Sequence, residues 1–241
     1  MSYASDNPYK NWGMVAAQAE TNERASFIRQ TYLHLLGAVA AFAAITGALL
    51  NSPLGERITE TLLGSQMGWL VVLGGFVLVS WIANKWASSS TSVGMQYLGL
   101  GLYVVAEAVI FVPLLYFASV QGPPNVIANA AILTAVVFCG LTAIVFVTGA
   151  DFSWMRTGLM VAGFAALGVI VCSILFGFNL GIVFIAAILL LASGYILYDT
   201  SNVLHHYRIG QHVAAALALF ASVALMFWYM IQLLMSLSSR D

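Results

Sequence analysis

Seven apolar runs of near bilayer length divide this chain of 241 residues and limit its fold more than any other feature. The runs cover about residues 30–50, 67–84, 94–118, 126–148, 156–177, 180–203 and 212–236. A helix needs about 20 residues, within a range of about 17–25, to cross the hydrocarbon core of a bilayer. The runs do not alternate between polar and apolar residues as barrel strands do. Because lipid forces each backbone amide to bond within its own segment, we predict an all-α, polytopic bundle of seven transmembrane helices.

The composition excludes several classes of protein. Apolar residues make up 61% of the chain and charged residues 7%. In an ordinary soluble domain, roughly a quarter of the residues are charged. The surface of a soluble enzyme of this size needs more charged side chains than this chain has, so the composition excludes that class. The formal net charge of −1 offers no basic surface for the phosphates of a nucleic acid. The expected environment is therefore the lipid bilayer, with no nucleic acid as a partner.

Basic residues predict the orientation of the bundle. With a cytoplasmic N-terminus, that side holds Lys10, Arg24, Arg29, Lys85, Arg156 and Arg208, and the other side holds Arg57 and Arg240. Because cytoplasmic loops carry an excess of Lys and Arg, we predict an N-in/C-out topology. The domain prediction is a cytoplasmic tail over residues 1–25 and a membrane domain over residues 26–241.

Two acidic residues fall inside the apolar runs. Glu107 lies near the middle of the third run, and Asp199 lies near the end of the sixth. A charge at the bilayer centre costs about 2.5–3.5 kcal/mol on insertion scales, so such a residue is a functional candidate by default. The alternative is that each carboxyl group only specifies how helices pack.

Polar residues follow Asp199 at helical spacing. Asn202 and His206 stand three and seven residues later, which places them on one helical face. Ser222 is a polar residue of the last run. Since histidine titrates near neutral pH, this face predicts a proton-responsive patch at the cytoplasmic mouth of the bundle. The alternative is a helix end that is polar because it reaches water.

The sequence does not indicate a catalytic site. The last run, from His212 to Ser236, has no lysine for a retinal Schiff base and no second aspartate for an intramembrane aspartyl protease beside Tyr198-Asp199. No phosphate-binding loop and no His/Cys metal spacing occurs. We therefore expect a protein that is not an enzyme and needs no cofactor.

Two segments resemble a known family. They are Tyr195-Ile-Leu-Tyr-Asp-Thr-Ser-Asn-Val-Leu-His205 and the loop Thr148-Gly-Ala-Asp-Phe-Ser-Trp154. With seven apolar runs, they resemble the Bax-inhibitor family, also called the transmembrane Bax-inhibitor-motif family, over about residues 24–241.

The resemblance implies two functions. In one branch of the family, a second aspartate in the last span pairs with the aspartate of span six as a pH-sensitive latch on a calcium leak path. Here that second position is Ser222. The serine and the Thr-Ser-Asn after Asp199 resemble the bacterial YccA-like branch, whose inner-membrane proteins restrain the FtsH membrane protease, which grips their N-terminal tail.

The hypotheses that remain open are therefore three. The first is a modulator of an FtsH-type protease in membrane stress response, located in a bacterial inner membrane. The second is a pH-sensitive leak channel for Ca²⁺ or H⁺, gated around Asp199. In it, oxygen atoms of Asp199, Ser222, Asn202 and Glu107 line the ion path, His206 contributes to pH sensing, and Asp199 holds Ca²⁺ weakly. The third is a bundle whose polar residues only fix helix packing.

Overall fold

The computed structural model of the chain describes residues 14–63, 66–89 and 92–238, and these ranges are helical apart from short connections. In chain order the elements are η1 (Ala16–Gln18), α1 (Thr21–Leu50), α2 (Pro53–Leu63), α3 (Gln66–Ala87), α4 (Val93–Gln121), α5 (Val126–Thr148), η2 (Ser153–Met155), α6 (Arg156–Phe176), α7 (Ile182–His205) and α8 (His212–Ser238).

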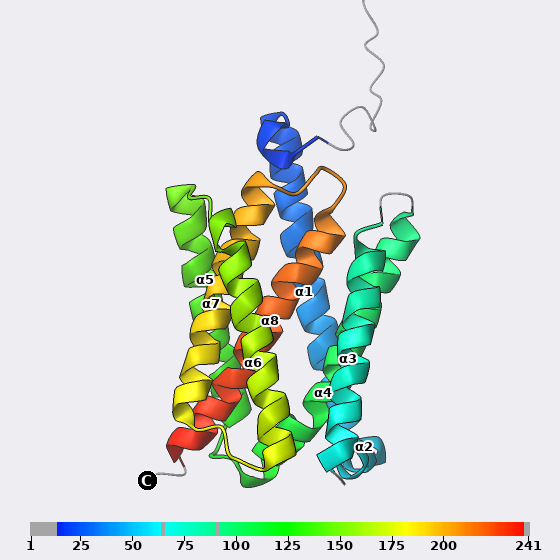
Figure 1. The fold of residues 1–241 in the computed structure, drawn as a ribbon. Coiled ribbons are helices and arrows are strands. Elements are labelled where there is room, and N and C mark those ends of the chain that lie inside the picture. The colour runs from blue at the N-terminus through cyan, green and yellow to red at the C-terminus, as the bar shows by residue number, and fades with distance from the viewer. Residues whose placement is uncertain (1–13, 64–65, 90–91, 239–241) are drawn as a thin grey trace, which may run out of the picture.

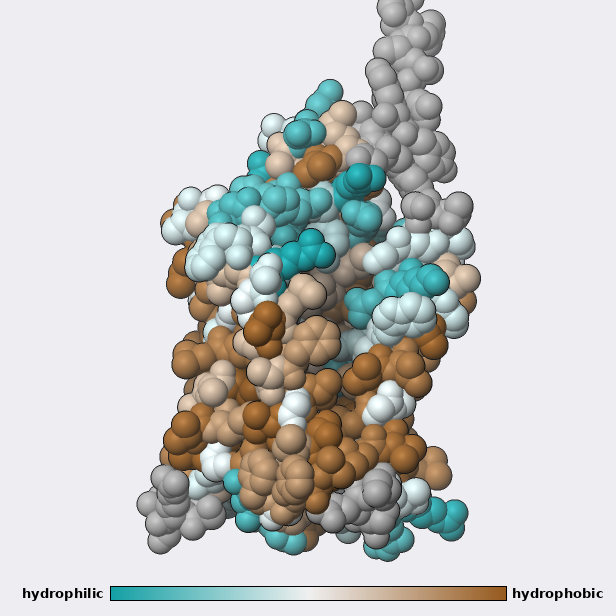
Figure 2. All heavy atoms as spheres, in the orientation of Figure 1, coloured by the Kyte–Doolittle hydropathy of each residue, from teal (hydrophilic) through white to brown (hydrophobic). Residues whose placement is uncertain are grey.

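Seven of these helices are long and apolar enough to cross a membrane: α1 and α3 to α8. They run side by side between two ends of the bundle (Figure 1). The space-filling view shows apolar residues over the body of the molecule and polar residues gathered at the end where the chain enters α1 (Figure 2). The prediction of an all-α, seven-span bundle is confirmed, and the chain is a multi-pass membrane protein.

The two ends differ in charge. The end at the start of α1, α6 and α8, called here the N-terminal end, carries the basic residues Arg24, Arg29, Lys85, Arg156 and Arg208. The opposite end, where α8 finishes, is called here the C-terminal end and carries Arg57 on α2. Lys10 and Arg240 lie outside the described residues. The N-in/C-out topology and the tail boundary at residue 25 stay predictions.

Helix α2 is an element that the apolar runs did not predict. Its 11 residues are too short to span a bilayer, and Glu56, Arg57 and Glu60 keep its hydropathy low. A weaker signal was present, because Pro53 suits the first turn of a helix and Leu54 and Ile58 recur one turn apart.

The interior of the bundle is built by α4 and α8. In the apolar windows of these helices, 61% and 67% of the residues are buried, against 11% in α3 and 6% in α6. Aromatic rings connect them to α1: Phe42 lies 4.9 Å from Phe111 and 5.9 Å from Phe220 between ring centroids. Edge-to-face pairs of this kind fix helix positions where lipid offers no hydrophobic drive between helices. The outer helices α3 and α6 turn most of their residues away from this interior.

Candidate functional site

Asp199 and Ser222 meet inside the bundle. Asp199 lies on α7 and Ser222 on α8, and the hydroxyl group of Ser222 donates a hydrogen bond of 2.5 Å to Oδ2 of Asp199. Both side chains are buried, with 8% and 5% exposed. The short connection between α7 and α8 makes the two helices antiparallel neighbours, which brings these residues to the same depth. A carboxyl group at this depth has no bulk water to bond with, so the serine supplies a partner.

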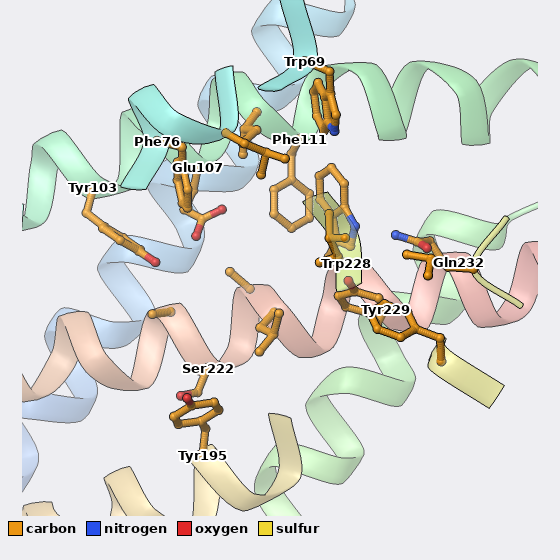
Figure 3. Close-up of a pocket in the computed structure, with 18 of the residues that line it drawn as sticks. Trp69, Phe76, Tyr103, Glu107, Phe111, Tyr195, Ser222, Trp228, Tyr229 and Gln232 are labelled. Atoms are coloured by element: carbon orange, nitrogen blue, oxygen red, sulfur yellow. The ribbon is translucent and has the colours of Figure 1, made fainter. Parts of the chain in front are cut away.

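Glu107 reaches the same region from α4. It is 7% exposed. Tyr103 precedes it by one turn, and the Tyr103 hydroxyl lies within hydrogen-bonding range of the Glu107 carboxyl group. Figure 3 shows the two side chains turned toward each other. The described residues give no hydrogen bond between the carboxyl groups of Glu107 and Asp199.

Both carboxyl groups line one cavity of about 630 Å³. From Asp199 and Glu107 the cavity extends toward the C-terminal end of the bundle, where Leu180, Phe184 and Gln232 line it. Nine aromatic side chains line it, and Figure 3 labels seven of them. The nine are Trp69, Phe76, Tyr103, Phe111, Phe184, Tyr195, Tyr198, Trp228 and Tyr229. No Lys, Arg or His is among the described residues that line it, so its two carboxyl groups have no basic counterpart there.

The N-terminal side of Asp199 is closed by tightly packed residues. Val203, Ala216 and Leu217 lie on this side and are 0%, 0% and 1% exposed. A segment before α1 lies over them. The backbone N–H of Ala16 donates to the carbonyl of Tyr207 at 2.8 Å, and the N–H of Ile209 donates to the carbonyl of Met14 at 2.9 Å. We call residues 14–19, held in this way on the α7–α8 connection, the N-terminal strap.

Tyr207 links the strap to Asp199. Its carbonyl accepts the hydrogen bond from Ala16, and its phenol feels the charge of the Asp199 carboxyl group. Burial raises the pKa of Tyr207, and the nearby carboxyl group of Asp199 raises it further.

The other two predicted site residues lie apart from the cavity. Asn202 is partly buried, and its carbonyl accepts the N–H groups of His206 and Tyr207 where α7 ends. Because α7 ends at His205, His206 leaves the helical face of Asp199 and turns toward the surface. There its Nε2 lies 3.1 Å from Oδ2 of Asp151. The roles predicted for Asn202 and His206 stay predictions.

Asp151 belongs to a polar cluster that the sequence analysis did not single out. Its Oδ1 accepts the N–H of Ser153 at 2.9 Å and the hydroxyl of Ser201 at 3.3 Å. The hydrogen bond from the Ser153 backbone, together with His206, lowers the pKa of Asp151 from 3.8 to about 2. This cluster fastens the α5–α6 loop to the end of α7. The Asp-Phe-Ser sequence of that loop is a turn signal that points to it.

A calcium ion would find few ligands at Asp199. Within the described part of the chain, no group of three or more His, Cys, Asp or Glu side chains is placed to hold a metal ion. The carboxyl group of Asp199 and the hydroxyl of Ser222 supply a few oxygen atoms, where Ca²⁺ takes six to eight. This donor set fits brief contact with a passing cation better than a resident metal.

Comparisons with known proteins agree with this architecture. The family model described as inhibitor of apoptosis-promoting Bax1 matches residues 24–239. An uncharacterized protein of Pseudomonas aeruginosa is 27% identical over 225 residues, which cover 90% of this chain and 92% of that protein. The modulator of FtsH protease YccA of Escherichia coli is 27% identical over 218 residues, or 89% of this chain and 91% of YccA. Protein lifeguard 4 of Mus musculus is 25% identical over 239 residues, or 95% of this chain and 93% of that protein. Since the family model covers most of its length, the chain belongs to the Bax-inhibitor family.

Proposed function

We propose that the cavity between Asp199 and the C-terminal end of the bundle is the inner part of a leak path for cations, Ca²⁺ or H⁺, across the membrane. The observation that carries this proposal is the hydrogen-bonded Asp199–Ser222 pair at the closed end of the cavity, with Glu107 lining the same cavity. Buried carboxyl groups are expensive in a bilayer, and those that line a cavity typically mark ion or proton pathways.

Charge supports a cation as the permeant species. The described residues that line the cavity include two carboxyl groups and no basic side chain. A low-dielectric wall strengthens the attraction between these carboxylates and a cation. Conduction also needs binding weak enough for release, which the few oxygen ligands at Asp199 provide.

The path is closed at the N-terminal end in this conformation. Val203 and Leu217 pack beyond Asp199, and the N-terminal strap covers the α7–α8 connection. Opening requires α7 and α8 to separate there. Protonation of Asp199 would remove the negative charge that attracts a cation. The strap is the element whose release starts this movement.

The test is ion flux into proteoliposomes loaded with a Ca²⁺ indicator, compared for the wild-type chain, Asp199→Asn and Glu60→Gln. Glu60 is an exposed acid on α2, outside the cavity, and serves as a matched control. We expect a wild-type flux that Asp199→Asn changes several-fold at about pH 8 and that Glu60→Gln leaves intact, because only Asp199 lies on the path. Flux equal to empty liposomes at about pH 6 and pH 8 contradicts the proposal.

A second candidate function is modulation of an FtsH-type membrane protease in a bacterial inner membrane, with the N-terminal tail cytoplasmic. One of the relatives is named a modulator of FtsH protease. The strap adds a structural reason, because it joins the segment before α1 to the connection next to Asp199. A protease that pulls on the tail would break the hydrogen bond between Ala16 and Tyr207 and so disturb the residues next to the closed end of the cavity. The excess of basic residues at the N-terminal end favours the cytoplasmic orientation.

The test for this second function is co-purification of an FtsH-type protease with three tagged forms of the chain in mild detergent. The forms are the full chain, the chain without residues 1–13, and the chain without residues 1–20, which also lacks the whole strap. We expect capture by the full chain and loss of capture in both shortened forms. Capture that is equal in all three forms, or absent from all three, contradicts a tail-mediated interaction.

A further inference from the structure

We infer that the cavity also binds a hydrophobic organic cation, such as an amine or onium group carried on an apolar body. The ligand enters from the lipid between α3 and α6 and places its positive charge near Asp199 and Glu107. This inference does not rest on ion conduction, because a bound organic cation needs a site and no through path.

The cavity has the size and the walls for such a ligand. Its volume of about 630 Å³ falls within the range of about 300–1,000 Å³ that small-molecule sites occupy. The faces of Trp69, Trp228 and Phe111 line it. Aromatic faces attract organic cations, and tryptophan is the strongest of them. A metal ion alone would leave most of this apolar wall unused.

Polar groups in the cavity remain available to a ligand. Within the described part of the chain, Oδ1 of Asp199 has no hydrogen-bond partner, whereas Oδ2 is bonded to Ser222. Tyr229 is 6% exposed and its hydroxyl has no hydrogen-bond partner among the described residues. Figure 3 shows Tyr229 among the side chains around the cavity, beside Trp228. Two polar groups on the lining of one cavity, one of them acidic, fit a cation.

The entrance lies between the two spans that bury the smallest share of their residues. Trp69, Leu73 and Phe76 of α3 and Ile170, Ser173 and Ile174 of α6 line the cavity, and each of them is partly exposed. Figure 1 looks onto this side with α6 in front of α8, and Figure 2 shows the surface hollowed between α6 and α3. Only 11% and 6% of the residues in the apolar windows of α3 and α6 are buried, so both helices border the lipid from which the ligand enters.

The experiment measures binding of radiolabelled tetraphenylphosphonium to the full chain in lipid nanodiscs at about pH 8. Empty nanodiscs give the background from partition into lipid. Triphenylphosphine oxide, which has three of the four phenyl groups and no net charge, is the neutral competitor. We expect saturable binding that unlabelled tetraphenylphosphonium displaces and that the neutral competitor displaces at least about tenfold less well, because the carboxyl groups recognise the charge.

Three variants locate the site. Asp199→Asn and Glu107→Gln each remove one charge and are expected to weaken binding by about tenfold or more. Trp69→Leu removes an aromatic face at the entrance and is expected to weaken binding of the cation while the carboxyl groups stay in place. Glu60→Gln, outside the cavity, should bind like the wild type. Thermal unfolding of each variant establishes that a loss of binding is not a loss of fold.

Three results overturn the inference. The first is binding that is no greater than in empty nanodiscs. The second is equal competition by the neutral compound, which makes the cavity a site for apolar molecules in general. The third is full binding by a folded Asp199→Asn, Glu107→Gln double variant.

Discussion

The hydroxyl group of Ser222 on α8 donates a hydrogen bond of 2.5 Å to the carboxyl group of Asp199 on α7, at the closed end of the cavity. The serine occupies a place where, as the family resemblance implies, another branch carries a second aspartate. One carboxyl group and one hydroxyl share this place, so no proton is shared between two carboxylates. The cavity still presents two acids, because Glu107 comes from α4.

Replacement of Ser222 by alanine should destabilise the bundle by about 1 kcal/mol, because Oδ2 of Asp199 loses its partner. The measurement is the free energy of unfolding in mixed micelles. Ser193→Ala is the matched control: its hydroxyl bonds to the carbonyl of Leu189 in its own helix, at 2.8 Å, and no second helix depends on it. Equal losses in the two variants would contradict a specific α7–α8 bond.

The α5–α6 loop should loosen in acid. The pKa of Asp151 is lowered from 3.8 to about 2, so its stabilising effect is fully present above about pH 4 and is lost as the pH falls toward 2. Asp151→Asn keeps the shape of the side chain and removes this titration. Hydrogen exchange of residues 149–155, corrected for the intrinsic rate, measures the opening.

In this experiment the wild type should open between about pH 4 and pH 2, and Asp151→Asn should be equally open at both values. Glu56→Gln on α2, at the other end of the bundle, is the control and should behave like the wild type. An acid transition that persists unchanged in Asp151→Asn would show that another group controls the loop.

The N-terminal strap should depend on the small size of Ala16. This residue is 0% exposed, and Ala17 beside it is exposed. Ala16→Glu places a charge where no space exists and should release the strap, whereas Ala17→Glu should leave it in place. Hydrogen exchange at the amide of Ile209, which donates to Met14, reports the release. Similar protection of that amide in both variants would contradict the strap.

Two glycines of α4 should respond in opposite ways to alanine. A Cβ at Gly99 would lie 2.5 Å from the carbonyl oxygen of Ala83, so Gly99→Ala must push α3 from α4 and should cost about 1–3 kcal/mol. A Cβ at Gly101 meets nothing within 4 Å, so Gly101→Ala should gain about 0.5–1 kcal/mol from helix propensity. Unfolding in micelles compares them, and a stable Gly99→Ala variant would refute the close α3–α4 contact.

Hydropathy predicted the seven spans because a bilayer imposes one length and one polarity on each of them. The same reasoning missed the start of α1, since the helix begins at Thr21, nine residues before the apolar run at 30–50. It also missed α2, whose polar residues lie at the end of the bundle. Apolar runs mark the part of a helix in lipid, and the helix itself extends into the polar zone.

The sequence offered Glu107 and Asp199 as separate candidates, and their common cavity could not be predicted from it. Depth along a helix follows from sequence position, which made Glu107 and Asp199 candidates. Their common cavity depends on which helices are neighbours and how each is rotated, and hydropathy carries neither. The helical spacing that joined His206 to Asp199 fails because α7 ends at His205, and no strong stop signal precedes that residue.

In the proposed leak path, cations reach Asp199 from the C-terminal end and are stopped there. Ser222→Cys, in a chain with Cys139 and Cys172 replaced by serine, puts a thiol beside Asp199. Right-side-out and inverted vesicles are treated with a trimethylammonium methanethiosulfonate or with its sulfonate counterpart. We expect the thiol to react from the C-terminal side, at least about tenfold faster with the cationic reagent than with the anionic one. Adding Asp199→Asn should remove this preference for the cationic reagent. Equal rates for the two reagents, or reaction from the N-terminal side, would contradict the proposed path.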